Sequence, residues 1–121
     1  MAFILVVDDE FSFAEVLQSV LSDAGHEVVM AVNGRQGLDR LGERRPDLVL
    51  RDFMMPIMDG PAMLRDMQQN PASRDIPVVV MSSLPESVVA DADGLFKAFL
   101  RKPFKLTAVM DTINSLLGEQ S

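Results

Sequence analysis

The sequence predicts an α/β fold, a doubly wound sheet of five parallel strands with helices on both faces. Five short apolar runs alternate with five segments in which apolar residues return every three or four positions. Short loops join these segments, so the alternation implies βαβ units with parallel strands and right-handed crossovers. Five such units in 121 residues are too few for an eightfold barrel. The expected strand order is therefore 2-1-3-4-5.

The first strand is expected at residues 3–7, an apolar run that is too short for a helix and rich in β-forming residues. The acidic residues 8–10 end it. A helix follows and is closed by Gly25, because apolar side chains return there at helical spacing. These side chains are Phe13, Val16, Leu17, Val20, Leu21 and Ala24.

The second strand is expected at residues 27–31, and Asn33-Gly34 is interpreted as a turn. Leu38 and Leu41 mark a modest helix that ends near residues 44–46.

The third strand, residues 48–50, delivers Asp52 to its carboxyl end. Pro56 stiffens the next loop, and Asp59-Gly60-Pro61 starts a helix with Asp59 as its cap. The apolar positions of this helix are Met63, Leu64 and Met67.

The fourth strand, residues 78–81, is the most strand-like run of the chain because three of its four residues are valine. A short helix over about residues 86–92 is stopped by Asp93-Gly94, and the last strand is expected at residues 96–101. The clearest helix comes last. Its apolar positions are Leu106, Val109, Met110, Ile113, Leu116 and Leu117.

Composition limits the class of protein. The net charge of −7 argues against direct nucleic-acid binding through a basic face and is compatible with a cation or a basic partner. The chain has no cysteine, which excludes disulfides and thiolate metal sites. No stretch approaches the ~20 apolar residues of a membrane span, and the start lacks a basic leader. We expect a single cytoplasmic domain over residues 1–121 with no membrane partner.

Polar side chains converge at the carboxyl edge of the predicted sheet. They are Asp8 and Asp9 after the first strand, Asp52 after the third, Ser82 after the fourth and Lys102 after the fifth. These strands are neighbours about 4.8 Å apart in the expected order. The order also reverses between the first and third strands, where such sheets bind their ligands. We therefore expect three carboxylates, a hydroxyl and an ammonium in one crevice.

Three crowded carboxylates favour a cation. A pair about 4 Å apart costs on the order of 4 kcal/mol near a protein surface, and helix capping accounts for one such group but not three. Lys102 offsets part of this repulsion, and a divalent ion would offset more. His26 lies at the opposite end and is interpreted as a loop residue. Ligation by oxygen alone selects a hard ion, and Mg²⁺ suits a few carboxylates that leave room for water and phosphate.

Taken together, these motifs resemble the receiver domain of two-component response regulators. They are Asp8-Asp9, Asp52 with Met55-Pro56 and Asp59-Gly60, Ser82-Ser83 and Lys102-Pro103. The resemblance covers nearly the whole chain, with every motif in order. It implies a flavodoxin-like (βα)5 fold and a stand-alone receiver of the chemotaxis-regulator kind, without an output domain.

The resemblance also implies a role for each residue of the crevice. Asp52 would be the phosphoacceptor, a carboxylate nucleophile that forms an acyl phosphate. Asp9 would ligate Mg²⁺ directly, Asp8 mainly through water, and Met54 through its backbone carbonyl. Mg²⁺ and Lys102 would neutralise charge on the transferring phosphoryl group.

Further positions follow from the same resemblance. The hydroxyl of Ser82 would bond the phosphoryl oxygen, and Phe99 matches the aromatic switch, although a partly buried strand aromatic is an equal interpretation. The Lys102-Pro103 peptide bond is expected to be cis. Arg51 is an unusual charge for a buried strand, and the sequence leaves open whether it reaches the sheet edge or pairs with an acid.

Three hypotheses of function remain. In the first, a histidine kinase or phosphotransfer protein phosphorylates Asp52 with Mg²⁺, and the face of the fourth helix, fifth strand and fifth helix changes its affinity for a downstream protein. Self-phosphorylation from small phosphodonors and self-dephosphorylation would be its only catalysis. The second is an aspartyl-nucleophile phosphatase, which would need an acid where Met54 stands. The third is a degenerate receiver that acts as a phosphorylation-independent adaptor, although every catalytic position holds a competent residue.

Overall fold

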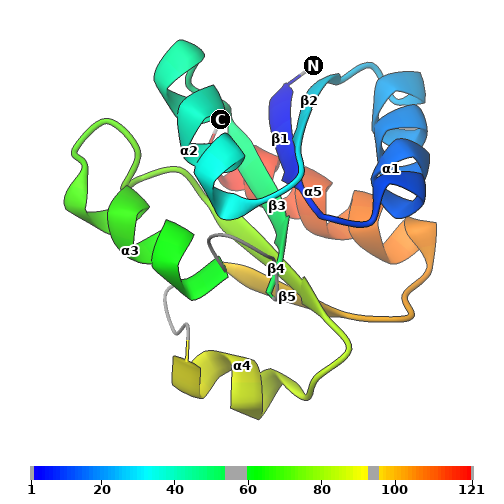
Figure 1. The fold of residues 1–121 in the computed structure, drawn as a ribbon. Coiled ribbons are helices and arrows are strands. Elements are labelled where there is room, and N and C mark those ends of the chain that lie inside the picture. Colours follow the sequence, from blue (N-terminus) through cyan, green and yellow to red (C-terminus); the bar gives the residue numbers. More distant parts are fainter. Residues whose placement is uncertain (1, 54–59, 93–95, 121) are drawn as a thin grey trace.

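Strands and helices alternate through the residues that the computed structural model describes, which are 2–53, 60–92 and 96–120 (Figure 1). The strands are β1 (Phe3–Val7), β2 (Glu27–Ala31), β3 (Leu48–Asp52), β4 (Val78–Ser82) and β5 (Ala98–Arg101). The helices are α1 (Phe11–Asp23), α2 (Gly34–Glu43), α3 (Gly60–Gln69), α4 (Glu86–Ala92) and α5 (Leu106–Gln120).

All the strands pair in parallel in one sheet of order β2-β1-β3-β4-β5, which confirms the predicted fold class. The register aligns the carboxyl ends of the central strands, with Val7 opposite Arg51 and Asp52 opposite Met81. Residues that follow β1, β3 and β4 therefore meet at one edge of the sheet.

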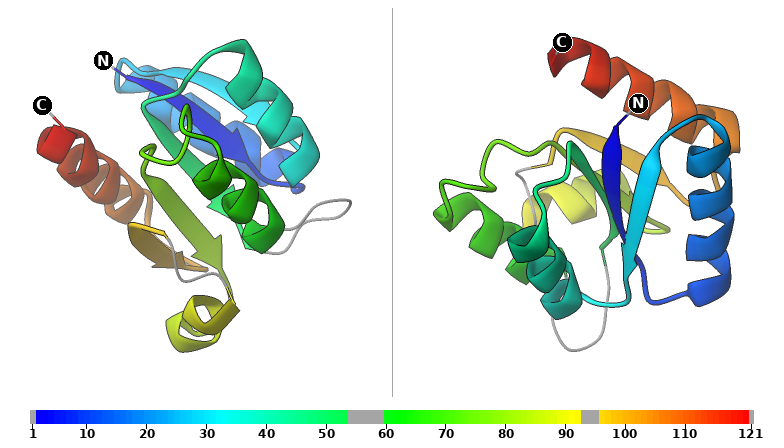
Figure 2. Two further views of the ribbon diagram at one scale, coloured as in Figure 1. Left: turned by 90° about the vertical axis from the view of Figure 1, so that its left-hand side faces the viewer. Right: turned by 90° about the horizontal axis from the view of Figure 1, so that it is seen from above.

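Helices cover both faces of the sheet, and alternate strand residues divide between two cores (Figure 2). In β1, Ile4 and Val6 join the core beneath α1 and α5, whereas Leu5 and Val7 join the core beneath α2, α3 and α4. Because both faces are covered, the strands need apolar residues at every position. This explains why they appear in the sequence as continuous apolar runs.

The chain bends at Asn33 as predicted, and Asn33 also caps α2, which the sequence interpretation did not include. The Asn33 side chain accepts a hydrogen bond from the backbone N–H of Gln36 at 2.8 Å. The Gln36 side chain in turn accepts from the N–H of Val32 at 3.0 Å. This reciprocal arrangement satisfies two backbone donors at the helix start, and Gly34 is already helical.

Three strands differ in length from the prediction, and β4 extends one residue further than expected, to Ser82. Pairing carries β3 as far as Asp52, two residues beyond the apolar run. The ladder between β4 and β5 begins at Val79 opposite Ala98, so β5 starts two residues later than expected. Pro56 and the predicted cap Asp59 lie outside the described residues.

Arg51 is fully buried in β3, with none of its surface exposed, so its side chain does not reach solvent. Its Nη1 donates a hydrogen bond to the backbone carbonyl of Asp52 at 3.3 Å. At the opposite end of the sheet, Nδ1 of His26 accepts from the backbone N–H of Ala2 at 3.1 Å. The Lys102-Pro103 bond is cis, as expected. In the part of the chain that the structure covers, no helix combines the length and the apolar character that a bilayer crossing requires.

Candidate functional site

The carboxylates of Asp8, Asp9 and Asp52 meet at the carboxyl edge of the sheet. Each offers an oxygen that lies within 4.8 Å of the other two. Asp8 and Asp52 are buried and Asp9 is exposed, so the cluster is open to solvent on one side. The convergence expected from the strand order is therefore present, at the point where the order reverses between β1 and β3.

Lys102 bridges the two buried carboxylates. Its Nζ lies 3.5 Å from Oδ2 of Asp8 and 3.3 Å from Oδ1 of Asp52. The backbone N–H of Lys102 donates to the carbonyl of Ser82 at 2.8 Å, so the end of β5 is held to the end of β4. This bond fixes the base of a long side chain whose ammonium must span the crevice.

The two carboxylate oxygens of Asp8 differ in their hydrogen bonding. Its Oδ1 accepts from the backbone N–H of Glu10 at 2.8 Å, just before α1 begins. Its Oδ2 is buried and has no hydrogen-bond donor among the described residues, and the ammonium of Lys102 is 3.5 Å away. Buried acceptors are nearly always bonded, so this oxygen suits a cation. The donor set of three carboxylates fits a hard divalent ion.

Burial makes the buried carboxylates hard to ionise. It raises the pKa of Asp52 to about 6, although the Lys102 ammonium opposes the shift and the Asp8 charge adds to it. Burial also raises the pKa of Asp8, against the hydrogen bond from the N–H of Glu10. Asp52 Oδ1 accepts from the N–H of Phe53 at 3.1 Å, which holds the carboxylate at the end of β3. A bound cation would favour the ionised form of both groups.

Ser82 ends β4, one strand away from Asp52, and is buried. Its Oγ accepts a hydrogen bond from the backbone N–H of Leu84 at 3.0 Å. A hydroxyl has one proton to donate, so this bond leaves its O–H available for an incoming acceptor.

Two further positions were predicted from the sequence, Phe99 and Met54. Phe99 lies half-buried in β5, with its ring centroid 6.1 Å from that of Phe96, and packs on the core beneath α2, α3 and α4. Met54, expected to offer its backbone carbonyl, lies outside the described residues.

One neighbour of the site was missed by reasoning from the sequence. The ring of Phe13 lies beneath the ammonium of Lys102, with its centroid 4.7 Å from Nζ. The helical pattern had assigned Phe13 only to the apolar side of α1. The sequence carried no signal of this contact, because Phe13 and Lys102 lie far apart in the chain.

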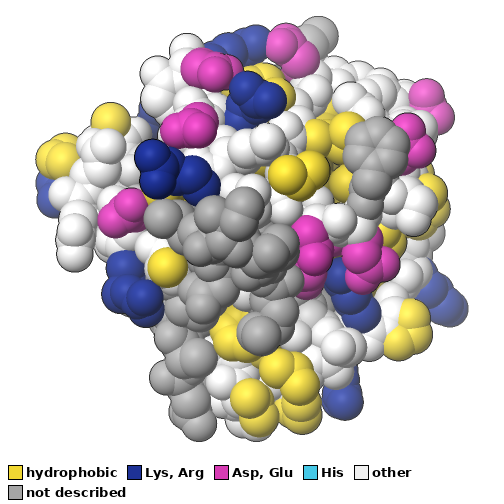
Figure 3. All heavy atoms as spheres, in the orientation of Figure 1, with side chains coloured by type: hydrophobic (Ala, Val, Ile, Leu, Met, Phe, Trp, Pro, Cys, Tyr) yellow, Lys and Arg dark blue, Asp and Glu magenta, His cyan; other side chains and the backbone are white. Residues whose placement is uncertain are grey.

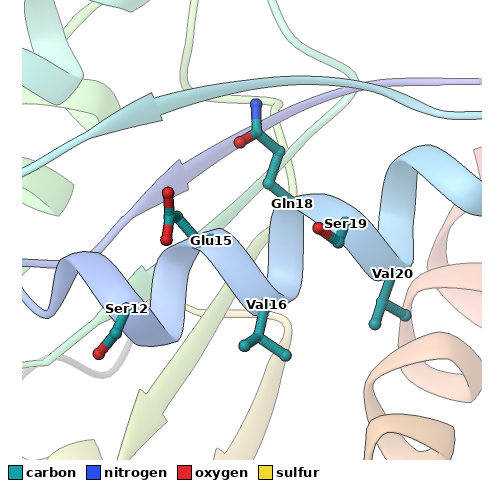
Figure 4. Close-up of a pocket in the computed structure, with 6 residues that line it drawn as sticks. All are labelled: Ser12, Glu15, Val16, Gln18, Ser19 and Val20. Carbon is teal, nitrogen blue, oxygen red and sulfur yellow. The ribbon is translucent and has the colours of Figure 1, made fainter.

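A surface hollow of about 450 Å³ on α1 is not part of the site (Figure 4). Its lining residues are Ser12, Glu15, Val16, Gln18, Ser19 and Val20. All of them come from one helix, and the sticks of Figure 4 point to different sides of it rather than toward a common point. The hollow therefore does not bring functional side chains together.

The fold and the cluster define a class, a doubly wound α/β domain with an acidic, lysine-bridged crevice at its topological switch point. Residues 4–114 match the family described as the response regulator receiver domain. The chain belongs to this family. Receiver domains are signalling domains that interact with histidine kinases or phosphotransfer proteins, and they bind Mg²⁺ at an acidic pocket.

Individual relatives agree with this assignment. The chain is 37% identical over 117 residues to the response regulator MprA of Mycolicibacterium vanbaalenii. This match covers 94% of the chain and 49% of the relative, so the chain spans about half the length of that protein. Among solved structures, the receiver domain of a histidine kinase from Syntrophus aciditrophicus has a TM-score of 0.90 at 33% identity, covering 98% of this chain and 92% of that one. The chemotaxis response regulator CheY4 of Vibrio cholerae has a TM-score of 0.87 at 27% identity, covering 96% and 98%.

Proposed function

We propose that the domain accepts a phosphoryl group on Asp52 and thereby switches its affinity for a partner protein. The observation that carries this proposal is the setting of the Asp52 carboxylate. It is nearly buried at the end of β3, lies 3.3 Å from the ammonium of Lys102 and faces two further carboxylates. A carboxylate so placed can act as a nucleophile toward phosphorus while positive charge stands beside it.

The proposed donor is a phosphohistidine of a histidine kinase or of a phosphotransfer protein. An oxygen of Asp52 attacks phosphorus, the new P–O bond forms, and the P–N bond breaks with its electron pair returning to the histidine ring. Lys102 stabilises the negative charge on the phosphoryl oxygens during transfer. With a pKa of about 6, Asp52 is mostly ionised at neutral pH and able to attack. Small phosphodonors would serve by the same displacement.

We propose Mg²⁺ as the ion of this site. Asp9 and Asp52 would hold it directly, Asp8 mainly through water, and Met54 would add its backbone carbonyl. This assignment is supported by Oδ2 of Asp8, which accepts no hydrogen bond from the described residues, and by the all-oxygen donor set. The ion would supply charge neutralisation at the phosphoryl group.

Phosphorylation would change the affinity of the face made by α4, β5 and α5 for a partner protein. Ser82 would donate its hydroxyl to the phosphoryl oxygen and draw its loop inward, and Phe99 would follow as the aromatic switch. Leu84 and Val88, which lie just before and on α4, are 39% and 49% exposed. Figure 3 shows hydrophobic side chains over α4 at the lower edge of this view. An exposed apolar surface beside the switch suits a downstream protein partner.

Incubation with acetyl phosphate tests the proposal. Wild-type protein with Mg²⁺ should gain the mass of one phosphoryl group, and peptide mapping should locate it at Asp52. The adduct should be absent in EDTA and in Asp52→Asn. Asp39→Asn, which changes an exposed aspartate of α2, should be phosphorylated like wild type. An unchanged mass of the wild-type protein would overturn the assignment.

A further inference from the structure

We propose that Phe13 is a positioning residue, whose ring face holds the ammonium of Lys102 at the phosphoacceptor. This inference rests on the proposed role of Asp52. It adds a residue of α1 that touches neither phosphorus nor metal and acts only through Lys102.

The ammonium lies between two carboxylates and an aromatic ring. Nζ of Lys102 is 3.3 Å from Oδ1 of Asp52 and 3.5 Å from Oδ2 of Asp8. It is also 4.7 Å from the ring centroid of Phe13, inside the ~6 Å within which a cation is attracted to a ring face. The side chain of Lys102 is only 20% exposed, so water screens these contacts weakly.

The ring of Phe13 is itself held in place. The Phe104 ring packs against it in an edge-to-face arrangement, with centroids 5.7 Å apart and planes at 70°. Phe104 follows Lys102 by two residues, so the segment that carries the ammonium also carries the ring that orients Phe13. Both rings pack on the core beneath α1 and α5.

The ring matters because a metal ion competes for the other contacts. A divalent cation at the cluster would draw on oxygens of Asp8 and Asp52 that now face Nζ. Of the described contacts of the ammonium, the ring is the one that such an ion does not take. A lysine side chain has four rotatable bonds, so an ammonium that loses its carboxylate contacts readily adopts other positions. Phe13 would keep it aimed at Asp52 while the metal is bound.

Replacing the ring should slow phosphorylation. Phe13→Leu keeps an apolar side chain and removes the ring, so we expect its rate with acetyl phosphate and saturating Mg²⁺ to fall about two- to fivefold. Phe13→Tyr restores a ring and should recover the wild-type rate, since Phe13 lines an open pocket of about 370 Å³ with room for a hydroxyl. Should Phe13→Leu melt below the assay temperature, Phe13→Met takes its place, because its unbranched, flexible side chain can fill the space of the ring in another way and also lacks a ring.

Phe3→Leu is the matched control. The ring of Phe3 also lies beneath a cation, with its centroid 3.9 Å from the guanidinium carbon of Arg44. It stands at the amino end of β1, away from the carboxylates, so its loss should leave the phosphorylation rate unchanged.

A spectroscopic measurement reads the contact itself. The chain has three lysines, Lys97, Lys102 and Lys105, so ¹³C-labelled lysine should give three resolvable ε-methylene signals. The Lys102 signal, assigned by its loss in Lys102→Arg, should be shifted upfield by the ring in wild type and Phe13→Tyr. It should return to the position of a free lysine in Phe13→Leu.

The outcomes separate the two proposals. A wild-type protein that gains no phosphate would refute the function of Asp52, and the NMR shift would still report on the contact. A phosphorylated wild type with an unchanged rate in Phe13→Leu would overturn the positioning role. So would a Lys102 signal that does not respond to loss of the ring.

Discussion

Asp52 destabilises the folded protein when it is ionised, because burial raises its pKa from 3.8 to about 6. For an acid with a raised pKa, the folded state holds the proton more tightly than the unfolded chain. The stabilisation that the folded state gains by holding the Asp52 proton is therefore fully present below pH 3.8, and it is lost as the pH rises through about 6. A shift of this size corresponds to a free-energy cost of about 3 kcal/mol at neutral pH. The proposed function would thus require a charge where stability alone disfavours it.

Asp52→Asn should stabilise the metal-free protein. At pH 7 in EDTA we expect a gain of roughly 1–3 kcal/mol in the free energy of unfolding, because the buried charge is removed. Near pH 4 the gain should approach zero, since wild-type Asp52 then carries a proton. Urea unfolding at both pH values measures the difference, and Asp39→Asn should change it by less than about 0.5 kcal/mol. A variant less stable than wild type at pH 7 would show that the carboxylate is not destabilising.

At the scale of elements, α2 packs closely on its neighbours at one glycine. A Cβ on Gly37 would lie 2.8 Å from Cε of Met63 on α3 and 3.2 Å from Cγ2 of Val7 on β1. A Cβ on Gly42 of the same helix would meet nothing within 4 Å. The close approach at Gly37 places α2 against the sheet beside the end of β1, where the acidic pair begins.

Alanine at these two positions should have opposite effects. Gly42→Ala should raise the free energy of unfolding by about 0.5–1 kcal/mol, because alanine favours a helix and has open space there. Gly37→Ala should lower it by about 1 kcal/mol, because overpacking against buried Met63 outweighs the same helical gain. Thermal unfolding of the two variants measures both effects. A Gly37→Ala variant as stable as Gly42→Ala would mean that Met63 moves aside freely.

The elements themselves were largely predictable, because strands covered on both faces must be apolar throughout. The exceptions depend on contacts that a local pattern does not contain. The cap that Asn33 forms on α2 is one of them, because it depends on the reciprocal hydrogen bonds with Gln36. The first residue of β5 was set by its pairing with β4 rather than by its own composition. The complete burial of Arg51 likewise depends on tertiary structure.

At the scale of the whole molecule, Mg²⁺ should stabilise the fold by binding only its folded form. Free Mg²⁺ at ten times its dissociation constant adds about 1.4 kcal/mol, or roughly 5 °C in the melting temperature. Asp9→Asn should lose most of this gain, because it removes a proposed direct ligand that is exposed. Melting in EDTA and in increasing MgCl₂ tests the expectation. An equal rise in wild type and Asp9→Asn would place the ion elsewhere.

The convergence of the site was predictable because topology alone brings the carboxyl ends of β1, β3, β4 and β5 together. Asp8, Asp52 and Lys102 meet as that argument requires. The contact of Phe13 with Lys102 was not predictable, because it depends on the side-chain directions of a residue in α1 and of a residue in the loop after β5. A helical pattern predicts that Phe13 lies on the apolar side of α1, but it does not predict which group contacts the face of its ring.

The position of one bound metal ion tests most directly the claim that these loops form a cation site around the phosphoacceptor. Mn²⁺ takes the same oxygen ligands as Mg²⁺, and anomalous scattering from crystals grown with Mn²⁺ locates it. The predicted result is a single ion about 2.1 Å from oxygens of Asp9 and Asp52, with Asp8 close by and the Lys102 ammonium still beside Asp52. An ion bound elsewhere, or Asp8, Asp9 and Lys102 directed away from Asp52, would contradict it.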